Sequence, residues 1–366
     1  MNVAGAHLTY CTNIHPGETW PEVRANLERH VVAVKQRVSP DAAFGVGLRL
    51  SGRAAHELAG EVAAVRRWLD DAGLYVFTIN GFPHGAFHGT PVKEAVYRPD
   101  WLEPERVAYT NLLADLLVEL LPDGVAGSIS TVPGCFRARA GGDAGTQIAA
   151  NLARCADHLV ALESRTGTHL MLALEPEPAC ALETLAEAID FFTAHRLDRR
   201  HIGLCLDTCH AAVEFEELAP TLAAIAAAGI PIAKLQLSAG MRIAPVTPAA
   251  RTALARFTDG VYLHQTVARH ASTLTRYVDL PEALADPRPA DEWRVHFHVP
   301  IFRAELGMLA STQDFLAEVL AVQRATPIST HLEVETYTWD VLPGEFRDEP
   351  IADAIARELR WVLKQL

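Results

Sequence analysis

The chain has 366 residues, of which 49% are apolar and 21% are charged, and its formal net charge at pH 7 is −13. This acidic balance disfavours tight binding to nucleic acid, because proteins that follow a phosphate backbone need basic stripes. No apolar stretch is long enough to cross a bilayer, so we expect a large buried core and no membrane span.

The N-terminus and the cysteines bear on the compartment. The first fifteen residues lack a basic region followed by an apolar stretch and a small-residue cleavage site, so we expect no secretory signal and a cytoplasmic location. None of the cysteines forms a C-x-x-C pair, and we expect all of them to be reduced and buried. They are Cys11, Cys135, Cys155, Cys180, Cys205 and Cys209.

Eight apolar, strand-like runs follow one another along the chain, and most lead into a helical pattern. They are His7–Cys11, Phe44–Leu50, Leu74–Asn80, Val125–Thr131, Leu170–Leu174, Ile202–Leu206, Ile232–Leu237 and Thr330–Val334. Repeated strand, loop and helix units predict a parallel sheet covered by helices. Eight such units predict the α/β class and a single (β/α)8 TIM barrel that takes up residues 1–366 as one domain.

Helical patterns are expected between these strands and after the last of them. They begin near Pro21, run from Ser51 through Leu69, and cover residues 145–166, 248–256, 261–275, 313–325 and 351–366. Two connections are long: the Gly/Pro/His-rich loop 81–89 after the third strand, and the extended connection 239–328 after the seventh. Because barrel active sites are built from the loops after the strands, both should form lids or walls of the site.

Polar residues gather where the predicted strands end. The clearest example is the stretch Leu204–His210, in which an apolar run leads into Asp207 and then His210. The side chains predicted to hold a divalent metal ion are Glu175, Asp207, His210, Gln236, His298 and Glu335. Carboxylates that enter an apolar barrel are costly unless they are paired or metal-bound, so their convergence favours a cation. Mixed carboxylate and imidazole ligands suit Mn²⁺ or Zn²⁺, with Mg²⁺ or Co²⁺ as alternatives.

Several of these residues also have a purely structural interpretation. Asp207 could simply cap the next helix, and His210 could lie on the surface. Glu177 could be an acid at a helix start, Glu333 an acceptor deeper in the barrel, and His296 a core histidine. A zinc-thiolate role for Cys205 or Cys209 is a further alternative.

The segment Leu206-Asp-Thr-Cys-His-Ala211 resembles the strand-six motif of endonuclease-IV-type enzymes and the wider xylose-isomerase-like barrels. The resemblance implies metal binding by Glu175, Asp207 and Glu335. Gln236 stands where this superfamily usually has a histidine, and His298 resembles the histidine of an Asp-x-His segment. Thr131 stands in place of a further histidine, so the resemblance implies one or two metal ions rather than three.

The whole chain, from Leu8 to Trp339, is more closely similar to the EboE family of metabolite traffic proteins. That resemblance implies a sugar-phosphate-isomerase-like barrel in a secondary-metabolite precursor (ebo-type) pathway.

The expected function is a metal-dependent isomerase or epimerase of a small polyhydroxylated metabolite: a sugar, a sugar phosphate or a cyclitol. Glu175 and Glu335 would exchange a proton with the substrate through an enediolate. One alternative is a metal-dependent phosphoester hydrolase of endonuclease-IV type, and another is a barrel that only binds a metabolite. The sequence does not fix the oligomeric state.

Overall fold

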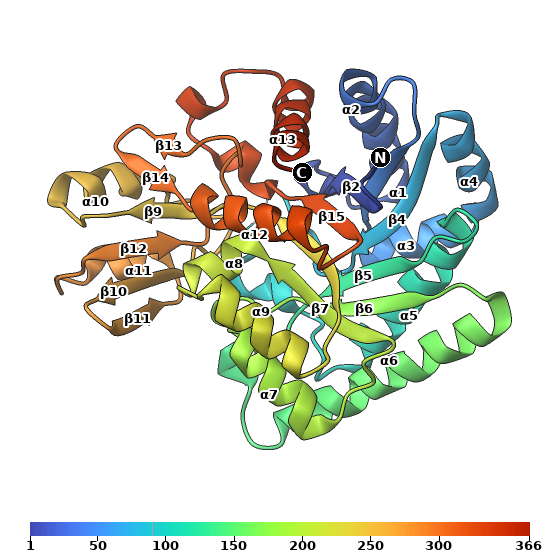
Figure 1. Cartoon of the computed structure of the whole chain (residues 1–366), viewed down its shortest axis with the longest axis horizontal. Coiled ribbons are helices and arrows are strands. Elements are labelled where there is room, and N and C mark those ends of the chain that lie inside the picture. The colour runs from blue at the N-terminus through green and yellow to red at the C-terminus, as the bar shows by residue number, and fades with distance from the viewer. Residues whose placement is uncertain (90) are drawn as a thin grey trace.

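The computed structural model describes residues 1–89 and 91–366, and its centre is a barrel of eight parallel strands with helices on the outside (Figure 1). The barrel strands are β2 (Ala6–Tyr10), β3 (Phe44–Arg49), β4 (Leu74–Asn80), β5 (Gly127–Thr131), β6 (Leu170–Leu174), β7 (Ile202–Asp207), β8 (Ile232–Leu237) and β15 (His331–Val334). Each overlaps one of the eight predicted strands. The predicted TIM barrel is therefore confirmed.

The strands lie in the order β2-β15-β8-β7-β6-β5-β4-β3, and a short β1 (Asn2–Val3) pairs antiparallel with β2. Between β2 and β3 a single bridge, Cys11 to Gly47, replaces a continuous ladder. The Thr9 hydroxyl completes this seam, because it donates to the Gly45 carbonyl (2.7 Å) and accepts from the Gly47 amide (3.2 Å). A side chain thus supplies part of the hydrogen bonding that closes the barrel.

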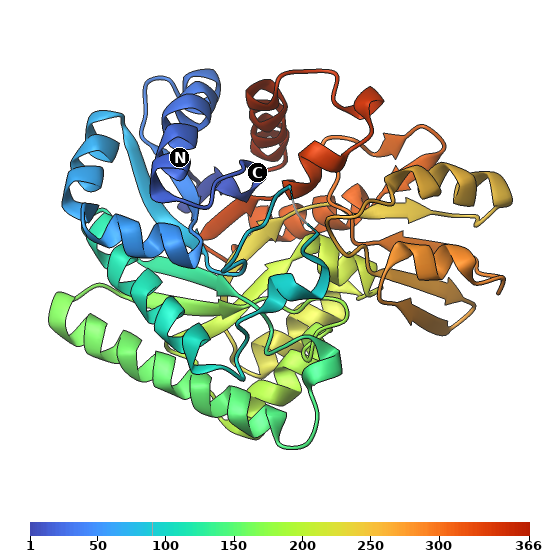
Figure 2. The same ribbon diagram turned by 180° about the vertical axis from the view of Figure 1, so that it is seen from behind.

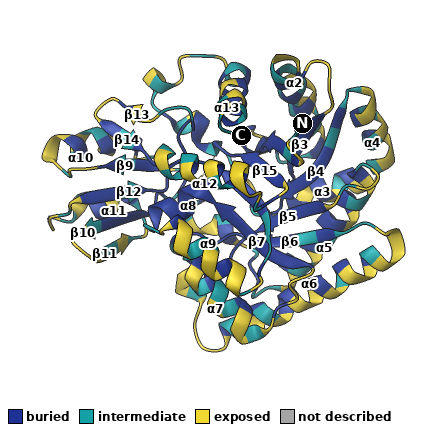
Figure 3. Ribbon diagram, viewed as in Figure 1, coloured by how far each residue is buried: buried dark blue, intermediate teal, exposed yellow. Residues whose placement is uncertain are grey.

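Helices cover the outside of the barrel, and most of them have a buried face and an exposed face (Figure 3). They are α1 (Trp20–Asn26), α2 (Val32–Val38), α3 (Gly52–Ala59), α4 (Val62–Asp71), α5 (Pro104–Leu120), α6 (Ala144–Thr166), α7 (Leu185–His195), α9 (Leu218–Ala227), α12 (Gln313–Ala325) and α13 (Ile351–Gln365). The predicted single helix from Ser51 through Leu69 is wrong. Gly60 ends α3 and Glu61 leaves the helical conformation (φ −138°), so the segment forms two helices.

The connection after β8 forms a second, antiparallel sheet that projects to one side of the barrel (Figures 1 and 2). Its strands are β9 (Met241–Ile243), β10 (Thr266–His270), β11 (Thr273–Tyr277), β12 (Glu292–Val295), β13 (Glu305–Leu306) and β14 (Leu309–Ser311), and two short helices, α10 (Pro248–Leu254) and α11 (Leu280–Ala285), pack beside it. We call this part the side sheet. The interpretation of residues 1–366 as one domain stays a prediction.

The helix predicted over 261–275 is wrong, because β10 and β11 form a hairpin there. Thr266, Val267, Thr273 and Thr275 are β-branched and favour strands, and Ala271 takes a left-handed turn conformation (φ 51°) between them. β12 pairs with the other edge of β10, so the hairpin belongs to a larger sheet. Tertiary pairing therefore overrode the helical pattern.

A charged pair fills the middle of the barrel. Lys234 on β8 and Glu333 on β15 are fully buried, and their charged groups lie 2.5 Å apart. Gly47 makes room for them, because a Cβ atom there would lie 1.7 Å from Glu333 Oε1. Glu333 is therefore paired with Lys234 inside the barrel. This agrees with the interpretation of Glu333 as an acceptor deeper in the barrel.

All six cysteines are free and buried. Among the described residues, no helix combines the length and the apolar character that crossing a membrane requires.

Candidate metal centre and active site

Three carboxylates meet at the carboxyl ends of the barrel strands. Glu175 follows β6, Asp207 ends β7 and Glu335 follows β15, and one oxygen of each lies within 4.8 Å of the others. All three side chains are buried. We call this group the carboxylate triad. Three buried negative charges at this spacing repel one another strongly, so the arrangement is stable only with protons or a cation.

The two oxygens of Asp207 have different surroundings. Oδ1 accepts hydrogen bonds from the amides of Cys209 (2.7 Å) and His210 (2.9 Å) and from the Ser238 hydroxyl (2.7 Å), and so caps the short helix α8 (Thr208–Val213). Oδ2 is buried and has no hydrogen-bond partner among the described residues. The helix-cap interpretation is therefore right for one oxygen, and the other remains available as a ligand.

Three histidines beside the triad are held through Nδ1. His210 Nδ1 lies 3.0 Å from the Pro176 carbonyl, and His298 Nδ1 lies 3.0 Å from the Glu335 carbonyl. Since a carbonyl oxygen can only accept, each Nδ1 must carry the proton. Each neutral ring then presents the lone pair of Nε2 to the site, as in histidines that bind metal ions.

His296 follows the same rule through a glutamine. Gln265 Nε2 donates to the Pro178 carbonyl (3.1 Å), which fixes the orientation of its amide. Gln265 Oε1 therefore faces His296 Nδ1 (2.8 Å) and accepts a hydrogen bond from it, so this Nδ1 also carries the proton. The Nε2 atoms of His210 and His296 lie 3.1 Å apart, so two lone pairs face each other. A proton or a cation must lie between them.

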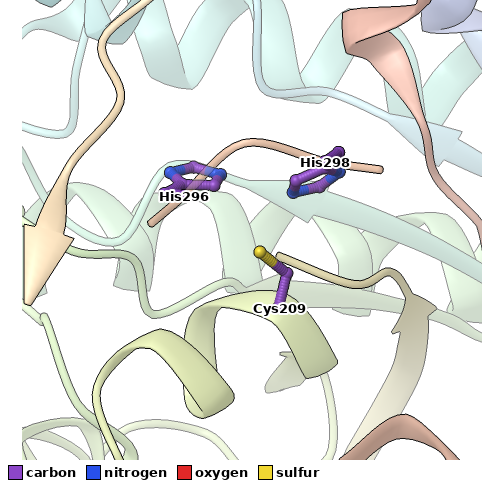
Figure 4. A group of neighbouring side chains, drawn as sticks. All are labelled: Cys209, His296 and His298. Atoms are coloured by element: carbon purple, nitrogen blue, oxygen red, sulfur yellow. The ribbon is translucent and has the colours of Figure 1, made fainter. Parts of the chain in front are cut away.

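The triad and the histidines form overlapping groups of possible ligands, each with its atoms within 4.8 Å of one another. These groups are Asp207 with His210 and His298, Glu177 with His210 and His296, and Cys209 with His296 and His298. Figure 4 shows the third group, in which the Cys209 sulfur at α8 points toward the two rings on the segment after β12. The structure thus offers ligand atoms for one metal ion at the triad and for a second metal ion at the histidines.

Burial and mutual repulsion shift the pKa values in this site. Burial raises the pKa of Glu335 to about 7, with Asp207 as a second cause. Burial, and then the charges of Glu335 and Asp207, raise the pKa of Glu175 well above its usual range. Burial lowers the pKa of His298 to about 4, so its ring is neutral at pH 7. Carboxylates held unfavourably as anions beside neutral imidazoles favour a bound cation.

Gln236, the sixth predicted ligand, lies beside the triad. It is in register with Asp207 on β7 and with Glu333 on β15. Its side chain is fully buried, and neither amide atom has a hydrogen-bond partner among the described residues. A buried amide without partners is costly, and a cation bound to its oxygen would satisfy one of the two amide atoms.

Sequence reasoning missed several residues that shape the site. Asn13 donates to Glu335 Oε1 (2.6 Å) and Asn80 donates to the same oxygen (3.1 Å). Tyr97 donates to Glu177 Oε1 (2.7 Å) and accepts from Gln265 Nε2 (2.8 Å). Asn80 is the last residue of β4, so its position at a strand end was a usable signal. Tyr97 and Gln265 lie in long connections, where no sequence pattern marked them as site residues.

A pocket opens over the triad. Its floor includes Glu175, Glu335 and His210. Its walls come from the loop after β4, the segment that leads to β10 and the segment after β15. Its position suits a small organic ligand that enters from the open end and reaches the carboxylates.

Several solved structures share the fold of this chain. A xylose isomerase-like TIM barrel protein from Mycobacterium smegmatis in complex with magnesium gives a TM-score of 0.56 at 11% identity, over 100% of this chain and 98% of that one. The probable 3-DHS dehydratase AsbF from Bacillus anthracis gives 0.50 at 12% identity, over 98% of both chains. The IOLI protein with a bound zinc atom gives 0.50 at 12%, over 98% of this chain and 96% of that one. At these identities the likeness shows the fold alone.

Comparison with the curated proteins gives no match. The sequence profile described as "Xylose isomerase-like TIM barrel" matches residues 43–272, which run from β3 through the side sheet's first hairpin strand. That stretch is more than half of the chain and contains Glu175, Asp207 and His210. The chain belongs to the xylose isomerase-like TIM barrel family.

Proposed function

We propose that this protein is a metal-dependent isomerase or epimerase that acts on a small polyhydroxylated metabolite, a sugar or a cyclitol. The observation that supports this most strongly is the carboxylate triad at the floor of the pocket. Two of its members, Glu175 and Glu335, line the pocket, so a bound substrate would meet carboxyl groups that can remove and return a proton.

The proposed ligands of the cation are Glu175, Asp207 and Glu335, with Gln236, His210 and His298 around them. The unpartnered Asp207 Oδ2 and His298 Nε2 support this set, because both are buried donors of electron pairs with nothing to bind. Zinc in one similar structure and magnesium in another support a divalent ion in this fold. Mixed oxygen and nitrogen ligands suit Mn²⁺ or Zn²⁺, with Mg²⁺ or Co²⁺ as alternatives.

A divalent cation bound at the triad would polarise the carbonyl of a hydroxyketone and stabilise the negative charge that develops on its oxygen. One of Glu175 and Glu335 removes the proton from the carbon beside the carbonyl, and the electron pair of that C–H bond moves into an enediolate. The other carboxyl group returns a proton. Return to the same carbon from the opposite face inverts its configuration. Return to the former carbonyl carbon moves the carbonyl, and the proton of the neighbouring hydroxyl then passes to the former carbonyl oxygen. Asn13 and Asn80 orient Glu335 for this step through their hydrogen bonds to Oε1.

A phosphoester hydrolase of endonuclease-IV type is the second candidate. The histidine pair His210 and His296 favours it, because a second ion beside the first suits the displacement of an alkoxide. The net charge of −13 weighs against a nucleic acid substrate. The resemblance to EboE proteins leads us to propose the secondary-metabolite precursor pathway as the setting of the reaction.

The test is turnover in deuterated water. Metal-loaded protein is incubated with a ketohexose, an inosose and the phosphate of each, and deuterium at carbon is measured by NMR. We expect deuterium beside the carbonyl of at least one substrate, with loss in Glu175→Gln and Glu335→Gln. Glu318→Gln, on the exposed face of α12, serves as the control. Phosphate release without C–H exchange would move the assignment to hydrolase, and complete inertness would favour a barrel that only binds its ligand.

A further inference from the structure

The pocket is roofed by three aromatic rings that touch one another. Phe87, Tyr262 and Tyr337 lie with ring centroids 5.1 to 5.3 Å apart. We call these rings the aromatic roof. They come from the loop after β4, the connection leading to β10 and the segment after β15, and they form an apolar cluster separate from the main core. Tyr337 also packs on the His298 ring, 4.7 Å away, so the roof begins directly above the histidines.

Below the roof, the pocket wall is largely apolar. Besides the roof, it includes Phe82, Val92, Val96 and Leu263. Tyr97 adds its ring, but its hydroxyl is engaged with Glu177 and Gln265. The pocket therefore has a polar floor, where the carboxylates lie, and an apolar upper part. A polyol alone uses only the floor.

The upper part offers little to a phosphate group. Lys93 is the one cationic lysine or arginine that lines the pocket within residues 1–89 and 91–366, and it is already occupied. Its Nζ donates to Asp279 Oδ2 (2.7 Å) and to the Tyr262 carbonyl (2.7 Å). Arginine forks or free ammonium groups are the usual partners of phosphate in proteins. The other ionisable residues of the pocket include Glu175, Glu177 and Glu335, and none of these is a cationic partner for a phosphate.

Two buried arginines hold the loop that carries Phe87. Arg49 lies behind Phe87 and donates to the carbonyls of Gly17 (2.8 Å) and Gly85 (2.6 Å), with Glu18 as its ionic partner. Arg106 donates to the carbonyls of Gly81 (2.6 Å) and Phe82 (3.0 Å). Their donors are directed at the backbone rather than at the pocket. The loop is thus fixed in place, and neither charge is free for a ligand.

From these contacts we infer that the substrate is an unphosphorylated polyol ketone that carries an apolar substituent, such as an alkyl or aryl ether. This inference rests on the proposed function and adds the substrate class. The hydroxyketone end meets the carboxylate triad, and the apolar substituent lies against the aromatic roof. Aromatic side chains bury much apolar area at little cost in conformational freedom, so they favour such a group over a charged one.

The test compares three ligands that share one head group: an inosose, its benzyl ether and its phosphate monoester. Their affinities for the zinc-loaded protein are measured by calorimetry, which needs no turnover. We expect the ether to bind at least tenfold more tightly than the parent, and the phosphate at least tenfold more weakly. Phe87→Leu and Tyr262→Ala should remove the preference for the ether, measured in each variant as the ratio of the ether's affinity to the parent's affinity. Phe302→Ala, an aromatic outside the pocket, is the matched control.

A charge placed in the wall gives a second, opposite test. Val96→Lys should reverse the order, so that the phosphate binds more tightly than the ether. The inference is overturned if the wild-type protein prefers the phosphate, or if ether and parent bind equally, in which case the roof only excludes water. Because binding is the readout, these outcomes are separate from the exchange experiment. Absence of deuterium uptake with a clear ether preference would reject the reaction and keep the ligand class.

Discussion

The histidines of the site owe their orientation to single acceptors on the backbone or on a fixed amide. The Pro176 and Glu335 carbonyls and the Gln265 side chain each accept a hydrogen bond from an Nδ1 atom, so the three rings direct the lone pairs of Nε2 into the site. Loss of a group that binds the second ring nitrogen of a metal-ligating histidine typically lowers metal affinity by roughly 10–100-fold. At this scale the site is prearranged, and cation binding needs no change of tautomer.

Asp207 is the residue whose loss should affect cation binding most, because it belongs both to the triad and to a group with two histidines. Asp207→Asn keeps a side-chain oxygen to cap α8 but removes the negative charge. Loss of a group that only orients a metal ligand lowers metal affinity by up to roughly 100-fold. Since Asp207 would itself bind the ion, we expect zinc affinity to fall by more than this. Calorimetry on metal-free protein measures this, with Asp71→Asn at the exposed end of α4 as the control. Unchanged affinity and stoichiometry in Asp207→Asn would place the ion elsewhere.

At the scale of elements, the barrel depends on a glycine at the seam between β2 and β3. A Cβ at Gly47 would lie 1.7 Å from Glu333 Oε1 and 2.7 Å from the Tyr10 carbonyl. Glu333 cannot move without leaving Lys234 as an unpaired buried charge.

Gly47→Ala is therefore expected to lower the free energy of unfolding by about 3 kcal/mol or more. Urea unfolding followed by circular dichroism measures it. Gly60→Ala is the matched control, because its new Cβ would meet only the Glu57 carbonyl at 3.7 Å, and we expect a change within about 0.5 kcal/mol. Equal midpoints for the two variants would show that Glu333 relaxes freely.

The barrel strands could be predicted because their sequences carry the signal themselves. Leu170–Leu174 and Ile202–Leu206 are continuous apolar runs, and a parallel strand buried on both faces produces that pattern. The hairpin of β10 and β11 carries no such run, because β11 is partly exposed along its length and β10 ends in the polar residues Arg269 and His270. Similarly, no local pattern shows that Gln265 and Tyr97 meet at Glu177, because only the folded connections bring them together.

At the scale of the whole molecule, α13 is tied to the active-site side of the barrel by one buried carboxyl group. Glu358 Oε1 accepts from the Thr336 hydroxyl (2.7 Å) and from the Ile301 amide (3.1 Å). Burial raises the pKa of Glu358 to about 7, against an ordinary value of 4.5. Since the folded state holds this proton more tightly, its contribution to stability is complete below about pH 4.5 and is lost as the pH rises through about 7.

Glu358→Gln keeps the accepting oxygen and removes the titration. Between pH 4.5 and pH 7.5 the free energy of unfolding should fall in both proteins. We expect the fall to be smaller in the variant than in the wild type, by on the order of 2–3 kcal/mol. Thermal and urea unfolding across this range measure the difference, with Glu318→Gln on the exposed face of α12 as the control. Parallel pH profiles for Glu358→Gln and the wild type would contradict the assignment.

The aromatic roof has a consequence for how the chain holds together. Phe87, Tyr262 and Tyr337 belong to the early, middle and late parts of the sequence, and they meet only above the pocket. A ligand beneath them acts as a non-covalent cross-link between these three parts. Release of the ligand then removes its contacts with all three parts at once. Residence time and resistance to proteolysis should therefore change together, even where the affinity for the carboxylate floor stays the same.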